Sequence, residues 1–323
     1  MEPEHRISRR SFCASAGAGT VALLWASRPI ALPEEPSRKT WPAGRYVDVH
    51  VHVGRVWNDT KDLGVKDLLA WMDSRQVSQA VILPLTSPES SSQLITNEHV
   101  LAETRPHRDR LVPFCCLDPR TSWNGGRAGL IDLLKRNVDA GARGFGEHKP
   151  GVKIDDPRSR RLYEACGELG LPVLFHLDEQ RNMDAPGLPG LETVLRGHPE
   201  VQFIGHGPGW WASISGDASE RDLAIYPRGP VPSRGAIDRL MDAHPNIHGD
   251  LSAGSGANAL ERDPAFAREF VLRRADRLLF GTDYLEPGQK TPQFEILEAM
   301  RLPPDVEAKV LRENARKLLK LTA

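Results

Sequence analysis

Short apolar segments alternate with amphipathic segments over most of this chain. Eight of the apolar segments are rich in branched and aromatic residues and are bounded by turn-forming residues, which is typical of parallel strands buried on both faces. These predicted strands are Tyr46–Val53, Gln79–Leu85, Leu111–Leu117, Ala142–Glu147, Leu171–Leu177, Val201–His206, Asn246–Leu251 and Arg277–Asp283.

The segments between the predicted strands have helical periodicity. Val65, Leu68, Leu69 and Met72 fall on one face of a helix predicted at Val65–Ser74. Further helices are predicted at Asn97–Arg105, Gly126–Ala140, Arg158–Leu169, Gly190–Gly197, Ser233–His244, Asp263–Arg273, Pro292–Met300 and Pro304–Leu319.

This alternation predicts an α/β fold, a (β/α)₈ TIM barrel over residues 45–323. A doubly wound open sheet is the alternative for the same pattern. No Gly-x-Gly-x-x-Gly follows the first predicted strand, so dinucleotide binding has no support.

Residues 1–31 are predicted to be a leader, and residues 32–44 a linker. The segment from Ser8 to Phe12 resembles a twin-arginine export signal, and the apolar run from Ala14 to Ala26 is too short to span a bilayer. We therefore expect an exported, periplasmic protein, which an uncleaved leader would tether to the membrane. The alternative is a disordered basic tail.

Composition narrows the classes of function. The 323 residues carry a formal net charge of -1, and no basic stripe interleaved with aromatic residues is present, so no nucleic-acid partner is expected. Besides Cys13 in the leader, the chain has Cys115, Cys116 and Cys166. Their number and spacing favour neither disulfides nor a zinc-cysteine site, and we interpret them as small core residues.

Ligand-type residues stand at the ends of four predicted strands. Asp48, His50 and His52 alternate along the first strand, so they are predicted to share the face that points into the barrel. His176, His206 and Asp283 end the fifth, sixth and eighth strands. In a barrel these ends meet at one face, where active sites are built.

This set of imidazoles and carboxylates predicts a centre for a divalent ion with an open position for water. Asp283 is expected to bind the ion or to accept the proton of the water, and His206 to be a further ligand or an acid/base group. Glu147 and Lys149, at the end of the fourth strand, would hold a second metal or an anionic substrate. The alternative for this pair is a solvated loop start.

The remaining polar residues have plainer interpretations. Asp48 and Asp250 are expected to hydrogen-bond neighbouring ligands or backbone rather than bind the metal. The other histidines that we interpret as surface or structural residues are His99, His107, His198, His244 and His248.

With these residues the chain resembles the amidohydrolase superfamily. It is most similar to the amidohydrolase-2 (amidohydrolase-related) branch, which is related to aminocarboxymuconate-semialdehyde decarboxylase. The resemblance implies a barrel of the metal-dependent hydrolase type with one divalent ion, usually zinc. It implies His50, His52, His176 and Asp283 as ligands, and His206 beside the metal as acid/base. The segments that carry the resemblance are Val47–His52, Leu171–His176, Phe203–Gly207, Leu279–Asp283 and Glu313–Leu318.

Three functions stay open from the sequence. The first is a hydrolase of amides, lactones or esters that acts through a metal-activated water on a small-molecule substrate. The second is a non-oxidative decarboxylase of unsaturated or aromatic acids, and the third is a binding barrel without turnover. Arg181, Trp210 and Trp211 are candidates for the substrate pocket, with a surface salt bridge and a packing pair as alternatives. Members of the resembled family are often homodimers, so a dimer is one expected state.

Overall fold

Eight parallel strands form two hydrogen-bonded sheets in the computed structural model, which describes residues 44–121 and 125–321. One sheet has the order β1-β2-β3 and the other β4-β5-β6-β7-β8. The strands are β1 (Tyr46–Val51), β2 (Val77–Ile82), β3 (Leu111–Pro113), β4 (Phe145–His148), β5 (Val173–His176), β6 (Phe203–His206), β7 (Ile247–Asp250) and β8 (Leu278–Leu279).

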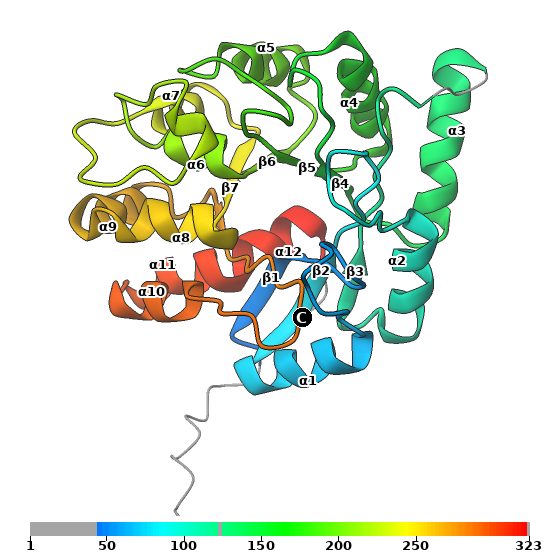
Figure 1. The fold of residues 1–323 in the computed structure, drawn as a ribbon, viewed down its shortest axis with the longest axis horizontal. Coiled ribbons are helices and arrows are strands. Elements are labelled where there is room, and N and C mark those ends of the chain that lie inside the picture. Colours follow the sequence, from blue (N-terminus) through cyan, green and yellow to red (C-terminus); the bar gives the residue numbers. More distant parts are fainter. Residues whose placement is uncertain (1–43, 122–124, 322–323) are drawn as a thin grey trace, which may run out of the picture. The chain divides into compact units, whose positions relative to one another are not determined.

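Backbone contacts at two seams join the sheets into a barrel. At the first seam Cys115 pairs in parallel with Phe145 of β4, and its N–H donates to the Gly144 carbonyl at 3.0 Å. At the second seam Val51 of β1 pairs with Tyr284, just after β8. Figure 1 shows the strands inside a ring of helices. The predicted TIM barrel is confirmed.

The helices follow the predicted rhythm, with two additions. The short α6 (Pro208–Ala212) and α8 (Ala253–Glu261) lie in segments for which no helix was predicted, and α9 corresponds to the helix predicted at Asp263–Arg273. The helices are α1 (Val65–Arg75), α2 (Asn97–Thr104), α3 (Gly126–Asp139), α4 (Pro157–Leu169), α5 (Pro189–Gly197), α6 (Pro208–Ala212), α7 (Ala236–Ala243), α8 (Ala253–Glu261), α9 (Pro264–Arg273), α10 (Gln293–Ala299), α11 (Pro304–Ala308) and α12 (Asn314–Leu319). The short turns are η1 (Arg105–His107), η2 (Asp222–Ala224) and η3 (Lys309–Glu313), the last of them π-helical.

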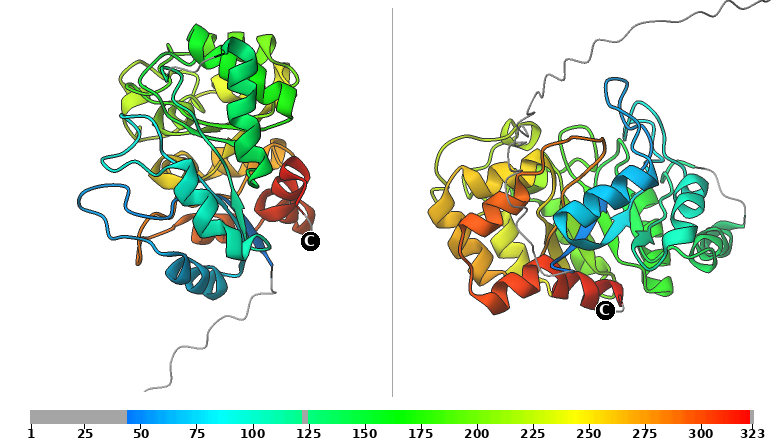
Figure 2. Two further views of the ribbon diagram at one scale, coloured as in Figure 1. Left: turned by 90° about the vertical axis from the view of Figure 1, so that its right-hand side faces the viewer. Right: turned by 90° about the horizontal axis from the view of Figure 1, so that it is seen from below.

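A small apolar cluster fills the barrel below the strand ends. Its members come from strands on opposite sides of the barrel, which meet only across the interior, and from α12. Figure 2 shows α12 at one end of the barrel and the loop after β1 at the opposite end. The buried members are Val47, Val49, Val81, Leu83, Val112, Phe114, Leu174, Ile204, Leu279, Ala315 and Leu319.

This cluster corrects the predicted alternation along β1. Val47 and Val49 belong to the interior cluster, whereas Val51 packs in the larger core between strands and helices. The pairing of β1 with β2 shifts register between Asp48 and Val51, and this irregularity changes which face the side chains take. The strict alternation of side chains between the two faces of β1 therefore breaks between Asp48 and Val51, the segment that contains His50.

Two further expectations concern the cysteines and the leader. Cys115, Cys116 and Cys166 are free and buried, as predicted. The leader, and the linker except Gly44, lie outside the described residues.

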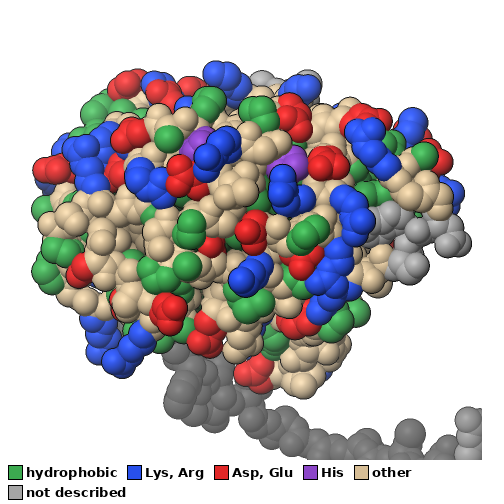
Figure 3. All heavy atoms as spheres, turned by 90° about the horizontal axis from the view of Figure 1, so that it is seen from above, with side chains coloured by type: hydrophobic (Ala, Val, Ile, Leu, Met, Phe, Trp, Pro, Cys, Tyr) green, Lys and Arg blue, Asp and Glu red, His purple; other side chains and the backbone are tan. Residues whose placement is uncertain are grey.

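None of the helices within residues 44–121 and 125–321 has the length and apolar content that a membrane crossing requires. The face drawn in Figure 3 carries acidic and basic side chains intermingled.

Candidate metal centre and active site

The ligand-type residues converge at the carboxyl ends of the strands. His50 lies in β1, His176 ends β5 and His206 ends β6, while Asp283 follows β8. The backbone of Asp283 has a φ of 56°, a left-handed conformation that Asp adopts more readily than most residues, and its N–H donates to the His50 carbonyl at 2.8 Å. This bend links the β8 end to β1 beside the histidines.

The imidazoles of His50 and His52 face each other through Nε2 atoms only 3.1 Å apart. The Nδ1 of His50 is 2.7 Å from an Asp250 carboxylate oxygen, and that of His52 is 2.9 Å from the Leu83 carbonyl oxygen. Both acceptors require a proton on Nδ1, so in the neutral rings each Nε2 presents a lone pair. Two opposed lone pairs at this distance call for a cation between them or a proton on one ring.

Two carboxylate oxygens complete this group of donors. The Asp283 Oδ1 lies 3.5 Å from the His50 Nε2 and 3.4 Å from the His52 Nε2. The Glu147 Oε2 lies 3.5 Å from the His52 Nε2 and is buried without a hydrogen-bond partner among the described residues. Ligands bound at 2.0–2.1 Å in a tetrahedral arrangement stand about 3.3 Å apart, so this set fits one divalent ion.

His176 lies in a neighbouring group of donors rather than beside His50 and His52. Its Nδ1 is 2.9 Å from the Glu147 Oε1, and its Nε2 is 2.8 Å from an Asp178 carboxylate oxygen. His176, Glu147 and His206 form a second set of potential ligand atoms within 4.8 Å of one another. Glu147 thus presents one oxygen to each group.

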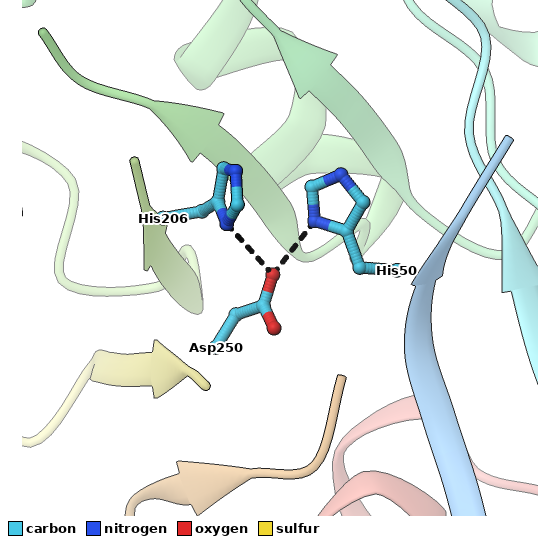
Figure 4. Close-up of side chains that lie close together, drawn as sticks. All are labelled: His50, His206 and Asp250. Carbon is cyan, nitrogen blue, oxygen red and sulfur yellow. Dashed lines mark hydrogen bonds and ion pairs between the residues drawn. The ribbon is translucent and has the colours of Figure 1, made fainter. Parts of the chain in front are cut away.

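The Asp250 carboxylate connects His50 with His206 (Figure 4). It lies 2.7 Å from the His50 Nδ1 and 3.3 Å from the His206 Nδ1. The Ser252 hydroxyl lies 2.8 Å from the same oxygen and 2.9 Å from the His206 Nδ1. Although Asp250 and both rings are close enough to share an ion, the 2.7 Å separation is that of a hydrogen bond. The contacts orient the rings, as expected for Asp250, and turn both Nε2 atoms toward the site.

The electrostatics of the site favour a cation. Burial raises the pKa of the Glu147 carboxyl, but the Lys149 ammonium and the neighbouring histidines together outweigh this and hold that pKa well below its usual range. Burial likewise opposes ionisation of Asp283, yet His50 and His52 lower its pKa to about 2. Burial lowers the pKa of His52, while its carboxylate neighbours raise it to about 9. The two carboxylates therefore stay ionised in a buried site.

A cavity of about 190 Å³ opens over these groups. A larger cavity of about 670 Å³ lies between α8, α9 and α10, away from the candidate ligands. The smaller cavity is therefore the candidate site because the potential metal ligands line it, although the other cavity has the larger volume. The smaller cavity is lined by His52, Val56, Trp57, Leu85, Lys149, His176, Asp178, Arg181, His206, Pro208, Tyr226, Ala253, Ser255, Asp283 and Leu285.

Comparison with known proteins shows the family of this chain. Residues 47–321 match the amidohydrolase family. The chain belongs to the amidohydrolase family. No curated protein matches the sequence.

Solved structures share the fold of this amidohydrolase at low sequence identity. A candidate 2-pyrone-4,6-dicarboxylic acid hydrolase from Pseudomonas putida has a TM-score of 0.61 at 17% identity, with 86% of this chain and 98% of that chain covered. The 5-carboxyvanillate decarboxylase from Sphingomonas paucimobilis has a TM-score of 0.54 at 14% identity, with 87% and 100% covered. A TIM-barrel protein from Bordetella bronchiseptica reaches 0.57 at 19% identity, with 80% and 83% covered. These likenesses support the fold.

Trp210 and Trp211 lie in the hydrophobic core of the amidohydrolase barrel and do not line the cavity. They belong to α6, whose helical turn directs both indoles inward. A Cβ on Gly205 would lie 2.5 Å from the Trp210 ring, so the missing side chain makes room for it against β6. The placement matches the packing pair, not the predicted pocket wall.

Arg181 and Lys149 line the cavity, but each faces a carboxylate. The Arg181 guanidinium pairs with Asp178 at 2.6 Å, and the Lys149 ammonium lies 3.4 Å from the Glu147 Oε1. Because both side chains line the cavity, Arg181 does not form an isolated salt bridge on the outer surface, and Lys149 does not begin a solvated loop. Arg181 supports the carboxylate that holds His176, which the sequence had not indicated.

The prediction missed several residues of the site. Asp178 and Ser252 each stand two positions beyond a strand-end ligand or its partner, a spacing that a search for polar residues after strands would have found. Trp57 and Tyr226 line the cavity from long connections. Those connections have no local pattern that marks them as part of the site.

Proposed function

We propose that this amidohydrolase is a metal-dependent hydrolase of an amide, lactone or ester bond in a small molecule. The observation that carries the proposal is the set of inward-facing donors on His50, His52, Asp283 and Glu147, with one Glu147 oxygen unpartnered. His50, His52, Asp283 and Glu147 would hold a divalent ion, which would lower the pKa of a water molecule and polarise a carbonyl oxygen. Zinc suits this nitrogen and oxygen set.

The surrounding side chains supply the proton transfers. Asp283 is ionised and one side of its carboxyl reaches the two histidines, so it accepts the proton of the attacking water. His206 is held through Nδ1 by Ser252 and Asp250, so the Nε2 of its neutral ring carries a lone pair. It takes up the proton that the water releases, by way of Asp283, and then delivers this proton to the leaving atom. The interior apolar cluster closes the barrel beneath the site and excludes water from that side.

The number of ions is part of the proposal. One ion fits the donors around His50 and His52, and we take this as the working site. The neighbouring group of His176, Glu147 and His206 would hold a second ion with Glu147 between the two. Elemental analysis of purified protein distinguishes one equivalent from two, and loss of one equivalent in Glu147→Gln supports the bridging arrangement.

A panel of lactones, esters and amides tests the proposed hydrolysis with zinc-loaded protein. We expect turnover of a member of the panel and a loss of at least about a hundredfold in kcat for Asp283→Asn, because one proton acceptor is removed. Asp132→Asn, on the exposed face of α3, is the matched control and should retain the wild-type rate. Silence across the panel from correctly loaded protein would contradict hydrolysis.

The second candidate is a non-oxidative decarboxylase, favoured by the Lys149 ammonium in the cavity, which provides positive charge for a carboxylate. Release of carbon dioxide from unsaturated or aromatic acids, with no turnover of the hydrolysis panel, would select it. We further propose export through the leader-like N-terminus. Fusion of residues 1–31 to a folded reporter and fractionation of the cells would test that step.

A further inference from the structure

A second cavity continues outward from the candidate active site. It has a volume of about 390 Å³ and shares Asp178, Arg181, Pro208 and Tyr226 with the inner cavity. The inner cavity, at about 190 Å³, is smaller than the roughly 300–1,000 Å³ of ordinary ligand pockets. The two together reach that range, so the substrate site extends beyond the metal centre.

The walls of the outer cavity differ in chemistry. One wall is polar and comes from the segment after β5, from Asp178 to Arg181. The apolar part of the lining includes Ala224, Ile225 and Tyr226, in the connection between α6 and α7. A flat apolar group with polar substituents at one edge matches such a lining.

The apolar wall is unusual for the surface of this protein. Among the described residues the exposed large hydrophobic side chains are Leu94, Ile225 and Tyr226, at 53%, 41% and 49%. Two of these three are neighbours in the same cavity. Exposed apolar side chains gathered at a cavity mouth indicate a binding surface rather than ordinary scatter.

Packing holds Tyr226 in this position. Its ring lies over the backbone of Gly254 at the start of α8, where a Cβ would come within 2.8 Å of the ring. Tyr226 also lines the inner cavity, beside Asp283. The ring therefore stands at the junction of the two cavities.

We propose that Ile225 and Tyr226 form a subsite for a flat apolar or aromatic group that the substrate carries beyond its reacting bond. This inference rests on the proposed function, since it uses the same metal centre. Ile225 and Tyr226 are specificity-determining residues: they contact the distal group and leave the reacting atoms to the histidines and Asp283.

Binding of two hydroxamates to zinc-loaded protein, measured by calorimetry, tests the subsite without turnover. Acetohydroxamate is small enough to occupy the inner cavity alone, whereas 2-naphthohydroxamate places its rings in the outer one. We expect the naphthyl compound to bind at least about tenfold more tightly, from the apolar area that its rings bury. Ile225→Ser and Tyr226→Ala should remove most of this gain, and Tyr226→Phe should restore it.

Leu94→Ser is the matched control, because Leu94 is equally exposed but lines neither cavity. It should keep the full gain, and acetohydroxamate should bind wild type and Ile225→Ser alike. Equal affinity for the two compounds, or a gain that survives both Ile225→Ser and Tyr226→Ala, would overturn the subsite while the metal centre stands. Failure of both compounds to bind would overturn the metal centre as well, and with it the proposed function.

Discussion

Replacing Gly205 by alanine tests how β6 and the buried tryptophan position the site. The added Cβ would lie 2.5, 2.6 and 2.9 Å from three carbons of the Trp210 ring, whereas carbons in contact are about 3.5–4.0 Å apart. The indole is fully buried, with Phe175 and Trp211 beside it, so it has little room to withdraw. We expect a loss near the upper end of overpacking costs, about 3 kcal/mol.

Urea unfolding of the metal-free protein, followed by circular dichroism, measures this loss. A thermal melt gives a second measure: for a domain of this size each kcal/mol of stability corresponds to roughly 2–4 °C in Tm, so Tm should fall by about 6–12 °C. Gly64→Ala is the control: its φ is -80° and no atom of the described residues lies within 4 Å of its added Cβ, so we expect a change under about 1 kcal/mol. Equal midpoints for the two variants would show that Trp210 does not pack against β6 as described.

Three further predictions concern charge and metal. Asp238→Ala removes the buried carboxylate that pairs with Arg273 and Arg274. Because Arg274 keeps its pair with Asp242, the unfolding free energy should fall by about 3 kcal/mol, the lower end for a broken buried pair. Asp139→Ala, in an exposed pair, should cost under about 1 kcal/mol, and similar costs for the two variants would contradict the burial argument. Zinc at a thousand times its dissociation constant should stabilise the wild type against thermal unfolding by about 4 kcal/mol. In thermal melts His52→Ala should lose most of this stabilisation and His107→Ala should keep it, so an unchanged response of His52→Ala to zinc would place the ion elsewhere. Asp250→Asn should weaken zinc affinity about 10–100-fold in chelator competition, and unchanged affinity would argue against its orienting role.

Much of the barrel could be predicted because its signals are local. Each strand is a short buried apolar segment, and parallel strands place their carboxyl ends at one face, so His176, His206 and Asp283 could be assigned to a common mouth from sequence alone. The existence of the donor cluster around His50 and His52 followed from the same reasoning.

The remaining features depend on tertiary contacts rather than on a local pattern of residues. The register shift in β1 arises from its pairing with β2, and no residue type near Asp48 marks it. The inward turn of Trp210 depends on space beside Gly205 in the preceding strand. Tyr226 stands at the site with its ring packed against Gly254 of α8, a contact that no pattern in the connection itself predicts.

The last helix of the described chain has a consequence for synthesis on the ribosome. Ala315 and Leu319 of α12 plug the barrel interior, and η3 packs against both β1 and β8, with Val310 accepting a hydrogen bond from the Phe280 N–H at 3.0 Å. The inner face of β1 is therefore covered only after η3 and α12, much later in the chain, have been made. A nascent chain arrested before residue 304 would leave the inner face of β1 without these contacts, so protection by a chaperone should persist until α12 has left the ribosome.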